Sequence, residues 1–129
     1  MRGLEITVSL DGENADIAVL TLNGYVDSST LEGINQTVRE RMSLGTRRFL
    51  LDLSGITYVS RRGWEAFMEN ARAAREAGGG LAVASMSRDV RGTYELMGGS
   101  SDLPVFDQVH EAARYLVSSG GGAARPPEA

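Results

Sequence analysis

The chain has 129 residues, of which 42% are hydrophobic, enough for one domain with a single core. Its formal net charge of -4 argues against a surface that neutralises a nucleic-acid backbone, and no cysteine is present to form a disulfide or a thiolate metal site. No segment approaches the roughly 18 apolar residues of a membrane span, and the N-terminus lacks the apolar core of a signal peptide. We therefore expect a cytoplasmic protein with no direct membrane insertion and no nucleic-acid partner.

The first elements are predicted to form a hairpin. Apolar and polar residues alternate from Leu4 to Leu10, which is typical of a half-buried edge strand. Residues 11–14 have the composition of a turn, and Ile17–Leu22 is an apolar run that suits a second strand. The two strands are therefore expected to be antiparallel.

A helix is predicted next. Ser29 and Glu32 have the spacing of a capping box, and Gly45 marks the end of the helix. Its apolar residues recur at helical spacing and are expected to face a sheet: Leu31, Ile34, Val38 and Met42.

The middle of the chain predicts a central strand and an amphipathic helix. Phe49–Leu53 is almost continuously apolar, as in a strand that is covered on both faces and lies parallel to its neighbour. A short loop should lead into a helix that ends at Gly78–Gly80. The apolar stripe of this helix consists of Trp64, Phe67, Met68, Ala71 and Ala74.

The last third of the chain repeats the alternation of strand and helix. Leu81–Met86 and Pro104–Phe106 are predicted strands. Ser87 is expected to cap a helix over Val90, Tyr94 and Met97 that stops at Gly98 and Gly99. Asp107 is expected to cap a final helix with the stripe Val109, Ala112, Ala113 and Leu116. Residues 119–129 have almost nothing to bury, so we expect a disordered C-terminal tail.

This order of elements indicates an α/β fold, because strands that alternate with helices form parallel βαβ units. We expect one domain over residues 1–118, with an N-terminal hairpin in a mixed, mostly parallel sheet of about five strands and about four helices.

The most informative segment is RFLLDLSGITYVSRRGWEAF, residues 48–67. It leads from a strand directly into a helix, and a helix N-terminus favours a phosphate or an acidic group. Arg61 and Arg62 place fixed positive charge at this junction instead.

Three segments together resemble a known family. They are GYVD at 24–27 before a helix, LLDLSGITYV at 50–59 leading to Gly63, and AGGGL at 77–81 before a strand. In this order and spacing they resemble the STAS domain of anti-sigma factor antagonists, over roughly residues 3–118. The resemblance implies a SpoIIAA-like fold. It also implies a switch in which the unphosphorylated antagonist binds an anti-sigma factor kinase and frees a sigma factor, and phosphorylation of one serine releases it.

The chain departs from the family at that serine. The loop before the second helix of the family typically reads aspartate, serine, serine or threonine, and glycine, whereas here it reads Ser60, Arg61, Arg62 and Gly63. The resemblance thus places Arg61 at the phosphoacceptor position, and Asp27 matches the acidic residue after the second strand. We hypothesise a non-enzymatic signalling module, independent of this phosphorylation, that binds a protein partner through Asp27, Ser28, Ser60, Arg61, Arg62, Gly63 and Trp64.

Each of these residues also has a plainer role. Arg61 and Arg62 can be solvated side chains, and Ser60 is either a displaced phosphoacceptor or, with better support, the N-cap of the following helix. Trp64 belongs first to the core, with an interface edge as the alternative. Asp27 can bind a cation, accept from an arginine or brace its turn, and turn chemistry is the commonest of these uses.

The sequence gives little support for enzymatic, cofactor or metal chemistry. His110, the single histidine, is expected to face solvent on the last helix. No G-x-S-x-G or phosphate-binding-loop motif occurs, so we expect no enzymatic activity, no cofactor and no metal.

An anti-sigma factor or a GHKL-type serine kinase is the favoured partner. A subunit of a membrane transport system is an alternative, since STAS-like domains also accompany transporters, and a small-ligand binder or enzyme on the same scaffold is a third. The chain is expected to be a monomer or a weak dimer, with Leu4–Leu10 as an edge available for pairing and Glu5 and Thr7 moderating it.

Overall fold

The strands form one sheet in the order β1-β2-β3-β4-β5. The computed structural model describes residues 3–10, 16–98 and 103–118. The strands in these ranges are β1 (Leu4–Leu10), β2 (Ile17–Val26), β3 (Arg48–Val59), β4 (Gly80–Ala84) and β5 (Val105–Phe106). The helices are α1 (Leu31–Ser43), α2 (Arg61–Glu76), α3 (Arg88–Leu96) and α4 (Val109–Ser118).

Strand polarity confirms the predicted fold class. β1 is antiparallel to β2, whereas β2, β3, β4 and β5 are mutually parallel. The mixed sheet therefore carries an N-terminal hairpin, as expected. The predicted turn at 11–14, the helix stop at Gly99 and the C-terminal tail at 119–129 lie outside the described residues.

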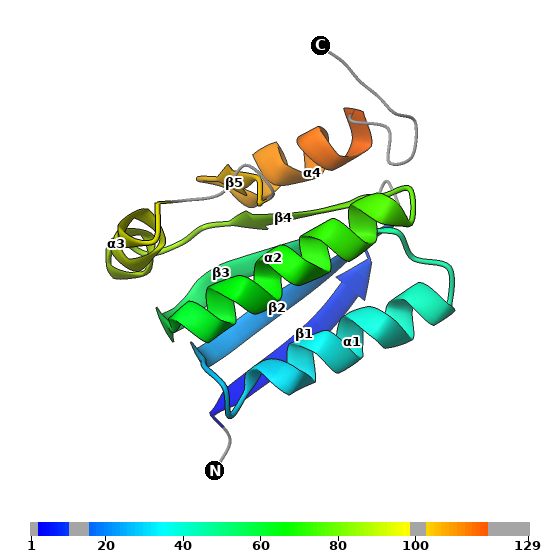
Figure 1. The fold of residues 1–129 in the computed structure, drawn as a ribbon. Helices are drawn as coiled ribbons and strands as arrows, with labels where there is room; N and C mark the ends of the chain where they lie inside the picture. Colours follow the sequence, from blue (N-terminus) through cyan, green and yellow to red (C-terminus); the bar gives the residue numbers. More distant parts are fainter. Residues whose placement is uncertain (1–2, 11–15, 99–102, 119–129) are drawn as a thin grey trace.

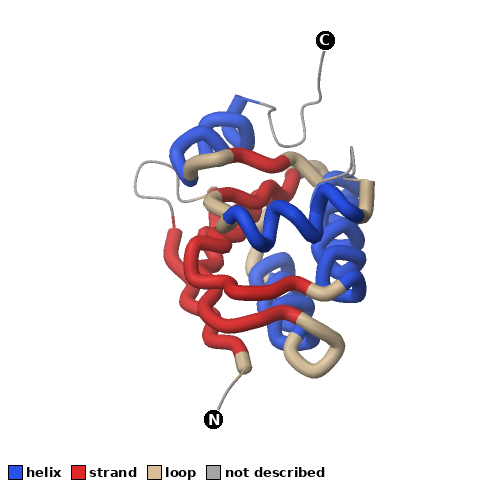
Figure 2. Tube along the Cα trace, turned by 90° about the vertical axis from the view of Figure 1, so that its left-hand side faces the viewer, coloured by secondary structure: helices blue, strands red, loops and turns tan. Residues whose placement is uncertain are grey.

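Helices cover the sheet unequally. α1 and α2 lie in front of the sheet in Figure 1, and α4 packs against β4 from the other side, with its own smaller apolar cluster. Figure 2, with strands in red and helices in blue, shows most of the helices on one side of the sheet. On the α4 face, the sheet near β1 and β2 presents polar side chains such as Thr7 and Thr21.

The centre of the core is β3. Phe49, Leu51 and Leu53 are fully buried toward α1 and α2, and Leu50 is fully buried toward α4. A strand whose successive side chains point to opposite faces must be apolar throughout when both faces are covered. This explains the almost continuous apolar run in the sequence.

The predicted end of this strand at Leu53 is wrong, because β3 continues to Val59. Its pairing with β2 shifts register twice and then resumes, so that Tyr25 faces Tyr58 and Val26 faces Val59. The side chains of Ser54 and Thr57 are polar and exposed, but backbone pairing with β2 sustains the strand. Only Ser60 separates β3 from α2.

The predicted capping box of α1 is also wrong. The N-cap residue is Thr30, and it makes no side-chain cap bond. The Glu32 carboxylate accepts a hydrogen bond from Arg39 at 2.9 Å, and this bond is the main cause that lowers the pKa of Glu32. Ser29 instead bonds Asp27 within the preceding turn.

Of the predicted caps of α3 and α4, one is confirmed. The Ser87 hydroxyl accepts from the Val90 N–H at 3.2 Å and caps α3. Asp107 does not cap α4, because α4 begins at Val109 and the Asp107 carboxylate accepts from Arg91 at 2.9 Å. The cap position belongs to Gln108, whose N–H donates to Glu111 Oε1 at 3.3 Å.

Two glycines offer a test of this packing. A Cβ at Gly79 would collide with the backbone carbonyl of Arg47, whereas a Cβ at Gly92, inside α3, would meet nothing within 4 Å. We expect Gly79→Ala to lower the free energy of unfolding by about 1–3 kcal/mol, because a backbone clash cannot be relieved by rotating a side chain. Gly92→Ala, the control, should raise it by about 0.5–1 kcal/mol through helix propensity. Urea unfolding measures both, and an unaffected Gly79 variant would contradict the close approach.

Candidate functional site

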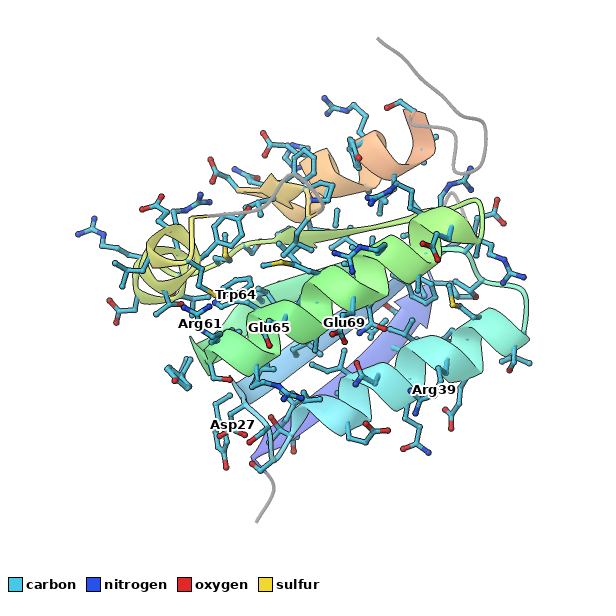
Figure 3. The ribbon with its side chains drawn as sticks, in the orientation of Figure 1. Asp27, Arg39, Arg61, Trp64, Glu65 and Glu69 are labelled. Carbon is cyan, nitrogen blue, oxygen red and sulfur yellow. The ribbon has the colours of Figure 1, made fainter. Side chains whose placement is uncertain are left out.

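The ends of β2 and β3 bring two loops together. The Ser60 N–H donates to the Val26 carbonyl at 2.9 Å, so the start of α2 is tied to the last residue of β2. The turn after β2, which begins at Asp27, therefore lies next to the first residues of α2. Figure 3 shows Asp27 and Arg61 at this same end of the molecule, on different elements.

Ser60 is the N-cap of α2, as predicted. Its backbone is extended, its hydroxyl accepts from the Gly63 N–H at 3.1 Å, and its carbonyl accepts from the Trp64 N–H at 3.0 Å. An N-cap serine satisfies an amide that has no partner within the helix. The hydroxyl therefore has a structural task at the junction.

Arg61 and Arg62 open α2 on its exposed side. No acidic residue occupies the first turn, and Arg62 Nε lies 3.8 Å from Glu65 Oε1, a weak surface pair. Within residues 3–10, 16–98 and 103–118, the Arg61 guanidinium has no hydrogen-bond or ion-pair partner. Positive charge near a helix N-terminus costs about 0.3–1 kcal/mol per residue when exposed. An acidic group from outside the chain would offset that cost.

Trp64 and Gly63 lie beneath this surface and not on it. Trp64 is 0% exposed, donates from Nε1 to Thr93 Oγ1 at 3.2 Å, and packs against Phe67 and Tyr94 with ring centroids 5.5 and 5.1 Å apart. This confirms the core role and corrects the inclusion of Trp64 among partner-contacting residues, because its indole does not reach the surface.

The inclusion of Gly63 among the partner-contacting residues is corrected for the same reason. A Cβ at this position would lie 2.9 Å from methyl groups of both Val26 and Val59. Glycine thus lets the start of α2 sit directly on the ends of β2 and β3, and the backbone of Gly63 is buried there.

Asp27 braces its own turn. Its carboxylate accepts from the Ser29 hydroxyl at 2.7 Å and from the Ser29 N–H at 2.8 Å, and these bonds lower the pKa of Asp27 below 3.8. Thr30 closes the turn by accepting from the Asp27 N–H at 3.0 Å. Turn chemistry, the commonest of the predicted uses, is therefore what the structure shows. Ser28 is exposed at the tip.

Sequence analysis missed two residues at this end of the sheet. Tyr25 and Tyr58 face each other across β2 and β3 and are 39% and 49% exposed. Exposed tyrosines are enriched in protein interfaces. The predicted strands ended at Leu22 and Leu53, which left both tyrosines outside the sheet, whereas β2 and β3 extend to Val26 and Val59.

The rest of the described structure adds no further chemistry at this end. His110 is exposed on α4, as predicted. The described residues contain no group of three or more His, Cys, Asp or Glu that could hold a metal ion. Among them, no helix combines the length and apolar character needed to cross a membrane.

Comparison with known proteins places the chain in a family. Residues 12–112 match the STAS domain family, so the chain belongs to it. A sequence relative is the anti-sigma factor antagonist BtrV of Bordetella bronchiseptica, 28% identical over 95 residues that cover 74% of this chain and 82% of BtrV.

Solved structures agree on the fold. An anti-sigma factor antagonist from Thermotoga maritima superposes with a TM-score of 0.76 at 15% identity, over 87% of this chain and 94% of that one. The Bacillus protein SpoIIAA in its unphosphorylated form gives 0.71 at 14% identity, over 88% and 97%. The SpoIIAA-like fold implied by the resemblance is therefore confirmed, and the homologues are anti-sigma factor antagonists.

The cap of α2 can be tested by substitution. Ser60→Ala removes the acceptor of the Gly63 N–H and should lower the free energy of unfolding by about 1 kcal/mol. Ser60→Asp, the matched control, keeps an acceptor and should retain most of the stability. Urea unfolding compares the variants, and equal stability of Ser60→Ala and the parent would refute the cap.

The turn around Asp27 predicts a pH effect. Because the pKa of Asp27 lies below its ordinary 3.8 in the folded state, the ionised carboxylate stabilises the fold above pH 3.8, and this contribution is lost as the pH falls through the folded-state pKa. Ser29→Ala removes the largest cause, so the pKa of Asp27 should rise toward 3.8. NMR titration of the Asp27 carboxyl carbon measures this. Ser43→Ala, whose hydroxyl donates to the Glu40 carbonyl, is the control and should leave it unchanged.

Proposed function

We propose that this protein is a non-enzymatic regulator of bacterial transcription that works by binding an anti-sigma factor, either alone or as part of a GHKL-type serine kinase. Support comes from membership of the STAS domain family and from relatives described as anti-sigma factor antagonists. The observation that carries the proposal is the pair of exposed arginines at the start of α2, beside the Asp27 turn.

The binding surface in this proposal consists of Asp27, Ser28, Ser60, Arg61 and Arg62, with Tyr25 and Tyr58 at its border. Arg61 is the central contact, because it is exposed and its guanidinium has no partner in the described part of the chain. A guanidinium binds a carboxylate through two parallel hydrogen bonds, which lysine cannot do. We therefore infer that the partner presents acidic side chains to the start of α2.

The same surface lacks the usual covalent control in this proposal. Arg61 takes the place of the family's phosphoacceptor, and arginine cannot accept phosphate from a serine kinase. The neighbouring hydroxyl of Ser60 is engaged with the Gly63 N–H as a cap. Binding is then regulated by the amount of each protein and not by phosphorylation at this loop.

The other two functions are not favoured. A transport accessory subunit and a small-ligand binder or enzyme are both compatible with the fold, but BtrV and the two solved structures described above are anti-sigma factor antagonists. We take the cytoplasm as the place of action, in line with such partners.

Charge reversal tests the binding surface. We expect Arg61→Glu to weaken binding to the anti-sigma factor encoded nearest to this protein in its own genome by on the order of tenfold or more, because an attractive contact becomes repulsive. Arg114→Glu on α4, which changes the net charge equally, should bind like the parent. Isothermal titration calorimetry measures both, and equal weakening by the two variants would refute the proposed surface.

Loss of phosphorylation has a separate test. After incubation with that anti-sigma factor and ATP, the intact mass of the protein should be unchanged. A stoichiometric phosphate on Ser60 would overturn the claim of lost control while leaving the binding surface in place.

A further inference from the structure

Among the described residues, nothing pairs with the outer edge of β1. The order of the described strands places β1 at one edge of the sheet with β2 as its only neighbour there, and β1 has seven residues, whereas β5 at the other edge has two. Figure 1 shows β1 at the border of the sheet, with α1 alongside it. A long edge strand presents backbone groups that can pair with another strand.

The hydrogen-bond pattern identifies these groups. The Tyr25 N–H donates to the carbonyl of Gly3, which continues the β1–β2 ladder one pair beyond Leu4 and Gly24. In an antiparallel ladder, residues that bond to the neighbour alternate with residues whose N–H and C=O point away. The groups that point away from β2 and out of the sheet edge therefore belong to Leu4, Ile6, Val8 and Leu10.

The side chains of β1 are sorted by face. Those of Ile6 and Val8 lie on the same face as α1, and Val8 and Leu10 remain 39% and 47% exposed. Thr7 lies on the opposite, uncovered face, between Glu5 and Ser9. Neither proline, lysine nor arginine occurs in β1. The strand thus carries one charged residue, Glu5, and none of the prolines or basic residues that most often prevent edge pairing.

We propose that β1 pairs antiparallel with β1 of a second copy of this chain, around a two-fold axis at Thr7. Leu4 then faces Leu10 of the second copy, Ile6 faces Val8, and every outward backbone group of both strands gains a partner. On the other face, Thr7 lies opposite Thr7, a favourable cross-strand pair, and Glu5 lies opposite Ser9. A register centred on Glu5 would instead oppose two carboxylates.

The helix beside β1 fits the same symmetry. An open groove of about 610 Å³ runs between them, and its α1 lining is Gly33, Gln36, Thr37 and Glu40. α1 connects the parallel strands β2 and β3, so it runs antiparallel to both of them. Because β1 is also antiparallel to β2, α1 runs in the same direction as β1. The two-fold axis therefore sets the two copies of α1 antiparallel, with Glu40 of each directed toward the Gly33 end of the other. This stripe carries a single charge, so the symmetry brings no like charges face to face.

This inference is independent of the proposed function, since it uses neither Arg61 nor the Asp27 turn. It is tested by sedimentation velocity of the full chain over a range of concentrations. We expect a monomer–dimer equilibrium in the parent. Thr7→Asp and Thr7→Lys should each raise the dissociation constant by on the order of tenfold, because like charges meet on the axis. An equimolar mixture of the two variants should recover the dimer.

The recovery in the mixture distinguishes pairing at Thr7 from a general loss of stability. Ala73→Asp on the exposed side of α2 adds the same charge away from β1 and should dimerise like the parent. Val8→Pro removes one outward N–H and should weaken the dimer more than Val8→Ala, which keeps it. A parent that stays monomeric, or a dimer that both Thr7 variants leave intact, would overturn the proposal.

Discussion

The pairing of β2 with β3 along their whole lengths is the constraint on which the rest of this structure depends. The ladder runs from Ile17 and Arg48 to Val26 and Val59, and it survives two register shifts near its end. Because both strands end at the same level, the turn after β2 and the start of α2 become neighbours. The Ser60 N–H then completes the junction through the Val26 carbonyl. If β3 ended at Leu53, backbone pairing would not hold the Asp27 turn beside Arg61.

The sequence predicted those elements whose pattern is set by burial. The almost continuous apolar run of β3 and the apolar stripe of α2 follow directly from faces that must avoid water, and both are found as expected. The second half of β3 was missed because its order comes from backbone pairing with β2, which leaves little trace in side-chain polarity. The α1 cap failed for a related reason, since Ser29 bonds Asp27 in place of the helix.

At the candidate site, the hydrogen bonds between residues close in sequence could be predicted, whereas the burial of side chains could not. Ser60 as a cap and Asp27 as a turn residue follow from interactions within a few positions of the chain. The complete burial of Trp64 depends on Thr93 and Tyr94, which come from α3 and are remote in sequence. The surface above this packing therefore exposes Arg61 and Arg62, while the indole of Trp64 beneath them stays buried.

The environment of Trp64 has a spectroscopic consequence. The chain contains one tryptophan, and its indole is enclosed by α2 and α3 and held by a hydroxyl of α3. Its emission therefore reports from a single position directly under the proposed contact surface, with no background from other indoles. A partner that binds only at Arg61 and Arg62 leaves this emission blue-shifted. A partner that separates α3 from α2 lets water reach the indole and moves the emission to longer wavelength.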